Sequence, residues 1–159
     1  MDILTPLGQE SLAQERRAVQ IFREHYPELH YVNTDKDSPI SIDAVITKDN
    51  SIVAAAECKC RQMTEEEFFT QFDGLWLLTY DKLAKAKELA GLLHVPLIGM
   101  LYLVPDDILL VKTLVRRDGT FDVSFNVDKT RTQATINGGE AVRDNAYIDM
   151  NDAKILVLE

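Results

Sequence analysis

The first segment with a clear hydrophobic pattern is residues 9–26, whose apolar positions recur at the spacing of an α-helix. Pro27 follows and ends the helix that this pattern predicts. The apolar stripe consists of Leu12, Val19, Phe22 and Tyr26. Glu15 falls on the same stripe. Because a buried carboxylate must be paired, hydrogen-bonded or bound to a cation, we expect Glu15 to have a specific partner.

A β-hairpin is predicted in the next part of the chain. Two runs of strand-like residues, 40–47 and 52–61, are joined by a polar connection with Asp and Asn at its centre. Antiparallel partners around this turn have residue numbers that sum to about 100, which places Asp43 opposite Glu57. Side chains alternate between the two faces of a strand, so Lys59 shares the face of Glu57.

Helices and strands alternate around this hairpin. Thr64 and Glu67 have the spacing of a capping box, which begins a helix. The nearly all-apolar run 96–104 is typical of a central strand covered on both faces. From residue 116 onward, β-prone runs alternate with turns. The remaining predicted elements are a strand at 29–33, helices at 64–78 and 81–94, and a strand at 108–115.

Length and composition fit one globular domain, residues 1–159, of which 46% are hydrophobic. No apolar run is long enough to span a bilayer, and the N-terminus lacks the pattern of a secretory signal, so we expect a cytoplasmic protein with no membrane partner. The net charge of −9 argues against a protein that coats nucleic acid through bulk positive charge. Cys58 and Cys60 are two residues apart on one strand, which suits neither a disulfide nor a four-ligand zinc site.

The charged residues of the hairpin and first helix suggest a metal site. Glu15, Asp43 and Glu57 are expected on converging surfaces, with Lys59 beside them. Mg²⁺ is held by one or two protein carboxylates together with water and substrate phosphate oxygens. It polarises a phosphate and lowers the pKa of a bound water, and a nearby lysine can orient that water. This combination is suited to phosphodiester hydrolysis, whereas Glu-x-Lys alone is too common to be informative.

The spacing of these residues resembles that of the PD-(D/E)xK nuclease superfamily, most closely its Holliday-junction-resolvase-like and phage members. Glu15, Asp43 and Glu57 are separated by 28 and 14 residues, and Lys59 completes the pattern. Isoleucine stands before Asp43 in place of the proline of the motif's name. The resemblance covers residues 8–104. It implies a restriction-endonuclease-like α/β (α+β) fold, with a mixed central β-sheet flanked by helices and with residues 105–159 as a β-rich C-terminal extension.

The resemblance also implies roles for individual residues. Asp43, Glu57 and the backbone carbonyl of Cys58 are expected to bind Mg²⁺, with Mn²⁺ as a substitute. Glu15 would be an accessory ligand, and Lys59 the catalytic lysine. The implied activity is that of a metal-dependent deoxyribonuclease, with an endonuclease favoured over an exonuclease, and a homodimer would suit a branched DNA substrate.

Further polar side chains are candidate contacts to nucleic acid. Lysine and arginine neutralise phosphates without reading the base sequence, although a solvated surface explains each of them equally well. Some superfamily members also carry a glutamine on the helix that follows the Glu-x-Lys strand. The candidates are Gln71, Lys82, Lys85, Arg116, Arg117 and Arg131.

Two other functions remain open at this stage. The chain is expected to be either a nuclease or a non-catalytic protein of the same fold that binds or assembles with a partner, which the acidic net charge favours. A third alternative is an unrelated α/β protein in which Lys59 only neutralises a structural glutamate.

Overall fold

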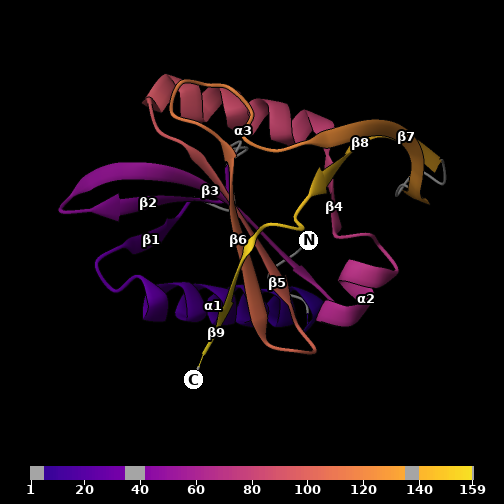
Figure 1. The fold of residues 1–159 in the computed structure, drawn as a ribbon, viewed down its shortest axis with the longest axis horizontal. Coiled ribbons are helices and arrows are strands. Elements are labelled where there is room, and N and C mark those ends of the chain that lie inside the picture. Colours follow the sequence, from indigo (N-terminus) through magenta and orange to yellow (C-terminus); the bar gives the residue numbers. More distant parts are fainter. Residues whose placement is uncertain (1–5, 35–41, 135–139, 159) are drawn as a thin grey trace.

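The computed structural model describes residues 6–34, 42–134 and 140–158 and has a mixed α/β fold. A six-stranded sheet has the order β1-β2-β3-β5-β6-β9, and a three-stranded sheet has the order β4-β8-β7 (Figure 1). None of the described helices is long and apolar enough to cross a membrane. The elements are α1 (Pro6–His25), β1 (His30–Asn33), β2 (Ala44–Lys48), β3 (Ser51–Arg61), α2 (Glu65–Thr70), β4 (Leu75–Thr79), α3 (Tyr80–Leu93), β5 (Leu97–Leu103), β6 (Ile108–Val115), β7 (Phe125–Ala134), β8 (Glu140–Asp149) and β9 (Lys154–Val157).

The predicted hairpin is confirmed, and it is formed by β2 and β3. Asp49 and Asn50 at its turn have φ values of 51° and 64°, the left-handed conformation that a tight two-residue hairpin turn requires. Ala44 pairs with Ala56, so the register runs toward Asp43 and Glu57 as the sequence predicts. The first strand begins later than expected, at Ala44, and the start of the predicted run lies outside the described residues.

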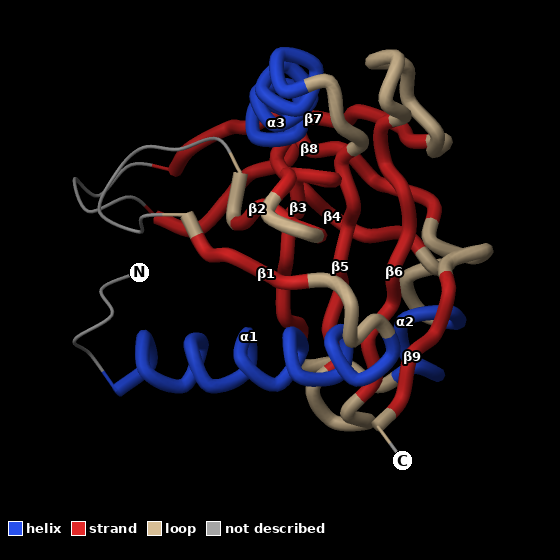
Figure 2. The backbone as a smooth tube through the Cα atoms, turned by 90° about the vertical axis from the view of Figure 1, so that its left-hand side faces the viewer, coloured by secondary structure: helices blue, strands red, loops and turns tan. Residues whose placement is uncertain are grey.

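The central strands of the six-stranded sheet are covered on both faces. β3 and β5 are parallel, and the other strand pairs of this sheet are antiparallel. Helices α1 and α3 lie on opposite faces, as Figure 2 shows. Ala54, Ala56 and Cys58 of β3 pack with α1, whereas Ala55 belongs to the core beneath α3. The small side chains of β3 thus let helices approach the sheet closely, and the side chain of Glu57 is directed to the α3 face.

The predicted buried stripe of α1 is partly wrong. The helix spans Pro6–His25 and ends before Pro27 as expected. Its buried side chains include Ala18, Ile21 and Phe22, whereas Glu15 is only partly buried. Ala18 packs in one cluster with Ala54 and Ala56 of β3. The predicted stripe members Leu12 and Val19 are only partly buried, and together with Glu15 they line a pocket.

The predicted helix at 64–78 is also wrong in its second half. The capping box of Thr64 and Glu67 is present, but α2 ends at Thr70. Asp73 and Gly74 have φ values of 55° and 70°, which end the helical path, and β4 follows. The aromatic and apolar residues of β4 alternate in burial, so Trp76 is buried in the core as part of a strand.

The predicted β-rich C-terminal segment is confirmed and is hydrogen-bonded to the rest of the protein. β8 lies between β4 and β7, and β9 pairs with β6 at the edge of the six-stranded sheet. The strands predicted at 29–33, 96–104 and 108–115 and the helix at 81–94 are found as β1, β5, β6 and α3. The C-terminal strands therefore complete both sheets.

Gly74 is a position where an alanine is expected to destabilise the fold. It has a φ of 70°, and an added Cβ would lie 2.4 Å from Oδ1 of Asn151. Asn151 is held by hydrogen bonds to the carbonyl of Asp73 and to the carboxylate of Asp149, so it cannot move aside without losing them. We expect Gly74→Ala to lower the free energy of unfolding by about 2 to 4 kcal/mol in urea titrations. Gly91→Ala is the matched control, since Gly91 lies in α3 with open space around it and should gain up to about 1 kcal/mol. Equal effects of the two changes would contradict this account.

Candidate metal centre

Four charged side chains meet on the α3 face of the sheet, and we call them the charged cluster: Asp43, Glu57, Lys59 and Lys82. Asp43 immediately precedes β2, Glu57 and Lys59 are on β3, and Lys82 is in the first turn of α3. Lys82 Nζ lies 3.3 Å from Asp43 Oδ1 and 2.9 Å from Glu57 Oε1. Lys59 Nζ lies 4.0 Å from Glu57 Oε1. The two carboxylates therefore converge on one cation, which is the ammonium group of Lys82.

Asp43 is fixed by its backbone and by its side chain. The backbone N–H of Cys58 donates a hydrogen bond of 2.9 Å to Asp43 Oδ2. The hydroxyl and backbone N–H of Thr34 both donate to the carbonyl of Asp43, and the N–H of Asp43 donates to the carbonyl of Ala56. Because Oδ2 is bound to the strand, Oδ1 is the oxygen that contacts Lys82.

Glu57 is a buried carboxylate with an unusual environment. Its side chain is 1% exposed, and among the described residues neither carboxylate oxygen accepts a hydrogen bond. Its contact with the ammonium group of Lys82, at 2.9 Å from Oε1, is an ion pair. Burial and the negative charge of Asp43 raise the pKa of Glu57 to about 7. A carboxylate in this state is poorly satisfied by the protein alone and suits a strongly charged cation.

The two lysines of the charged cluster differ in their electrostatics. Burial and the nearby positive charge of Lys82 lower the pKa of Lys59. Burial acts in the same direction on Lys82, but the Glu57 carboxylate outweighs it and raises the pKa of Lys82. Lys82 is thus the main counter-ion of the carboxylates, and Lys59 is a second, less tightly paired ammonium at the same place.

The backbone carbonyl of Cys58 points toward the side of β3 where Asp43 lies. The backbone groups of Ala55 and Arg61 form hydrogen bonds on the side of β3 that faces β5. Those of Ala56 and Cys58 form hydrogen bonds on the other side, with Asp43. The N–H and C=O of one strand residue point to the same neighbour, so the carbonyl of Cys58 shares the direction of its N–H. Two carboxylates and one carbonyl are oxygen ligands of the kind that Mg²⁺ takes. These residues therefore fit a hard divalent cation.

Glu15 does not join this group. Within the described ranges, no three His, Cys, Asp or Glu side chains come together in a way that could hold a metal ion. α1 packs on the face of the sheet opposite to α3. The buried Tyr31 hydroxyl has a raised pKa, chiefly because of burial, and the charges of Glu15, Asp43 and Glu57 all act on it in the same direction. The described residues thus do not form a three-carboxylate metal site, and the role of Glu15 as an accessory ligand stays a prediction.

The other predicted contact residues lie apart from the charged cluster or outside what the structure describes. Gln71 is the exposed C-terminal cap of α2. Lys85 is exposed and pairs with Asp81 one turn earlier in α3. Arg117 is exposed in the turn after β6. Arg131 belongs to β7, but its side chain is outside the described part of the structure.

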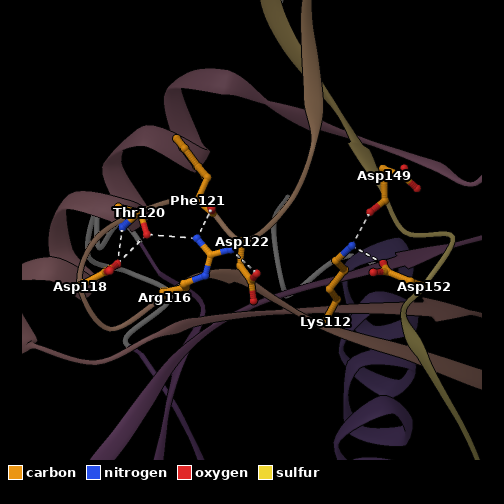
Figure 3. A network of polar contacts seen from close by, with 8 residues as sticks. All are labelled: Lys112, Arg116, Asp118, Thr120, Phe121, Asp122, Asp149 and Asp152. Carbon is orange, nitrogen blue, oxygen red and sulfur yellow. Dashed lines mark hydrogen bonds and ion pairs between the residues drawn. The ribbon is translucent and has the colours of Figure 1, made fainter.

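Arg116 takes part in a separate polar network beside β6, which is drawn in Figure 3. Its guanidinium donates to the carbonyl of Phe121 at 2.8 Å and to Asp122 at 2.7 Å. Lys112 in the same network donates to the carbonyl of Asp149 and pairs with Asp152. The network lines an open pocket of about 530 Å³. Both cations are thus neutralised by nearby groups of the chain, which weakens the expectation that Arg116 contacts a phosphate.

Sequence reasoning missed the position of Lys82, which it assigned only to a phosphate contact. The signal that would have found it is the need of two carboxylates on one sheet face for a counter-charge, which a lysine or arginine on the covering helix can supply. The sequence did not show which helix this was.

No protein-family model, curated protein or solved structure matches this chain in comparisons with known proteins.

Proposed function

We propose that this protein is a Mg²⁺-dependent nuclease that hydrolyses phosphodiester bonds of DNA, with Mn²⁺ as a substitute for Mg²⁺. The observation that carries the proposal is the convergence of Asp43 and Glu57 on a single cation position, with Lys59 beside it. Carboxylates too far apart to share one cation would have excluded the site. The resemblance of the residue spacing to PD-(D/E)xK nucleases supports the choice of substrate.

The chain's own groups have distinct tasks in this proposal. Asp43, Glu57 and the carbonyl of Cys58 would hold the metal ion. When bound, Mg²⁺ supplies Lewis-acid polarisation of the phosphate and lowers the pKa of a coordinated water. Lys59 orients the attacking water through its ammonium group and stabilises negative charge that develops on the phosphate. Its partial exposure, 31% of the side chain, leaves it accessible to a substrate.

One observation favours a second candidate, a non-catalytic protein that binds or assembles with a partner. Two carboxylates and two ammonium groups give the charged cluster no net charge, and the whole chain carries −9. Such a cluster could be a purely structural group of ion pairs under a helix.

The homodimer also stays a prediction. β8 is paired on both sides within the chain and has no free edge for a second copy, whereas β9 is an edge strand of the six-stranded sheet.

A cleavage assay separates these candidates. The purified protein is incubated with supercoiled plasmid, linear duplex and a four-way junction, each with Mg²⁺, Mn²⁺ or EDTA. We expect cleavage of at least one substrate with Mg²⁺ and none with EDTA, and nicking or linearisation of the plasmid identifies an endonuclease. Absence of cleavage on all three substrates, together with no Mn²⁺ binding in calorimetry, would favour the non-catalytic protein.

A further inference from the structure

Lys82 lies on α3, outside the β2–β3 hairpin, and its side chain contacts the two carboxylates at the hairpin. It is the third residue of α3, and the neighbouring Leu83 and Ala86 are buried, which anchors the helix over the sheet. The side chain of Lys82 is 33% exposed, whereas that of Glu57 is 1% exposed. The ammonium group therefore approaches the carboxylates from the accessible side of the site.

The oxygens that contact Lys82 are the ones a metal ion needs. Asp43 Oδ1 and Glu57 Oε1 both lie within 3.3 Å of Lys82 Nζ, while Asp43 Oδ2 is bound to the backbone of β3. A divalent ion bound to these two oxygens would lie against the ammonium group, and two cations in contact repel each other strongly in a partly buried site. The metal ion and the ammonium of Lys82 therefore exclude each other from this position.

We propose that Lys82 is a placeholder cation: its ammonium group neutralises Asp43 and Glu57 in the metal-free protein, and a divalent ion binds by displacing it. The inference rests on the metal site of the proposed function. Lysine suits this task because its ammonium is a compact charge on a flexible stem. The displaced group stays beside the site, where it contacts a phosphate of the substrate.

The charges of the site support both the displacement of Lys82 by a metal ion and its later contact with a phosphate. With Lys82 in place, the charged cluster has two negative and two positive groups. A bound Mg²⁺ adds two positive charges without removing either lysine from the surroundings, so the loaded site has an excess of positive charge. A phosphodiester, which carries one negative charge, lowers that excess. Metal and substrate are therefore expected to bind together more strongly than either does alone.

The test uses Mn²⁺ alone as the probe, in calorimetry with the full chain. Lys82→Met keeps an unbranched side chain, one atom shorter, and removes the competing charge, so we expect it to bind Mn²⁺ at least about tenfold more tightly than the wild type. Lys82→Arg keeps the charge and should not bind more tightly than the wild type. Lys85→Met is the matched control, since Lys85 is one turn along α3 and pairs with Asp81, and its Mn²⁺ affinity should be unchanged.

A second readout checks folding and the role toward phosphate. The melting temperature of Lys82→Met without metal is expected to fall, because Glu57 loses its main counter-ion, and Mn²⁺ should raise it more than in the wild type. With Ca²⁺ present, Lys82→Met should bind duplex DNA more weakly than Lys85→Met does.

The outcomes distinguish this inference from the proposed function. Cleavage of DNA by the wild type with unchanged Mn²⁺ affinity in Lys82→Met would overturn the placeholder role and leave the nuclease standing. Tighter Mn²⁺ binding by Lys82→Met, together with no cleavage of any DNA substrate by the wild type, would support the placeholder role and overturn the nuclease. Failure of both proteins to bind Mn²⁺ would overturn both proposals. If Lys82→Met does not fold, tighter binding by Lys82→Gln than by Lys82→Arg gives the same support, and equal affinities overturn the inference.

Discussion

Replacing Asp43 with asparagine is expected to abolish Mn²⁺ binding in calorimetry and to lower Mg²⁺-dependent DNA cleavage by about 10³-fold or more. A loss of this size corresponds to about 4 kcal/mol in the activation free energy. The change removes the negative charge that faces Lys82 but keeps an oxygen able to accept the hydrogen bond from the N–H of Cys58. The fold should therefore survive while the metal site fails.

The matched control for this change is Asp81→Asn. Asp81 is an exposed carboxylate on α3 that pairs with Lys85, so it lies near the charged cluster without belonging to it. Its variant should cleave DNA and bind Mn²⁺ like the wild type. An Asp43→Asn protein that is folded by circular dichroism and retains full cleavage would remove Asp43 from the site.

Glu57→Gln is expected to stabilise the metal-free protein at pH 8 and to abolish metal binding. The pKa of Glu57 is raised from its ordinary value of 4.5 to about 7, so the folded state binds this proton more tightly than the unfolded state. The resulting stability is fully present below about pH 4.5 and is lost as the pH rises through 7. At pH 8 the ionised Glu57 costs the metal-free protein about 3 kcal/mol, and glutamine removes that cost.

Urea titrations at several pH values measure this effect without metal. The free energy of unfolding of the wild type should carry a component that falls between pH 4.5 and 8 and is absent in Glu57→Gln. Glu66→Gln, which changes an exposed glutamate of α2, serves as the control and should keep the wild-type slope. Saturating Mn²⁺ should stabilise the wild type at pH 8 and leave Glu57→Gln unchanged. Parallel pH profiles for the wild type and Glu57→Gln would show that Glu57 is ionised at no cost.

The local part of the site could be predicted from the sequence because strand alternation and hairpin register are short-range properties. Asp43, Glu57 and Lys59 lie within one hairpin, and its register at the site is set by the two-residue turn at Asp49 and Asn50 together with a register shift in the strand that leads into the turn. Alternation along β3 then decides which side chains share a face. No knowledge of the rest of the chain is needed for these steps.

The contacts between distant elements could not be predicted in the same way. Lys82 reaches Glu57 only because the chain turns at Asp73 and Gly74 and forms β4 before α3, where helical spacing of apolar residues indicated a longer helix. The position of Glu15 relative to the sheet could not be predicted, because periodicity identifies a helix face but not the sheet face on which it packs. The contact between Lys82 and Glu57 and the place of Glu15 depend on tertiary packing rather than on the local sequence pattern.

A crystal structure of the protein with Mn²⁺ tests the central claim most directly. The account predicts an anomalous scattering peak about 2.1 Å from an oxygen of Asp43 and from an oxygen of Glu57, with the ammonium group of Lys82 moved away from both. Crystals at saturating Mn²⁺ in which Lys82 Nζ still bridges the two carboxylates and no peak lies between them would contradict it.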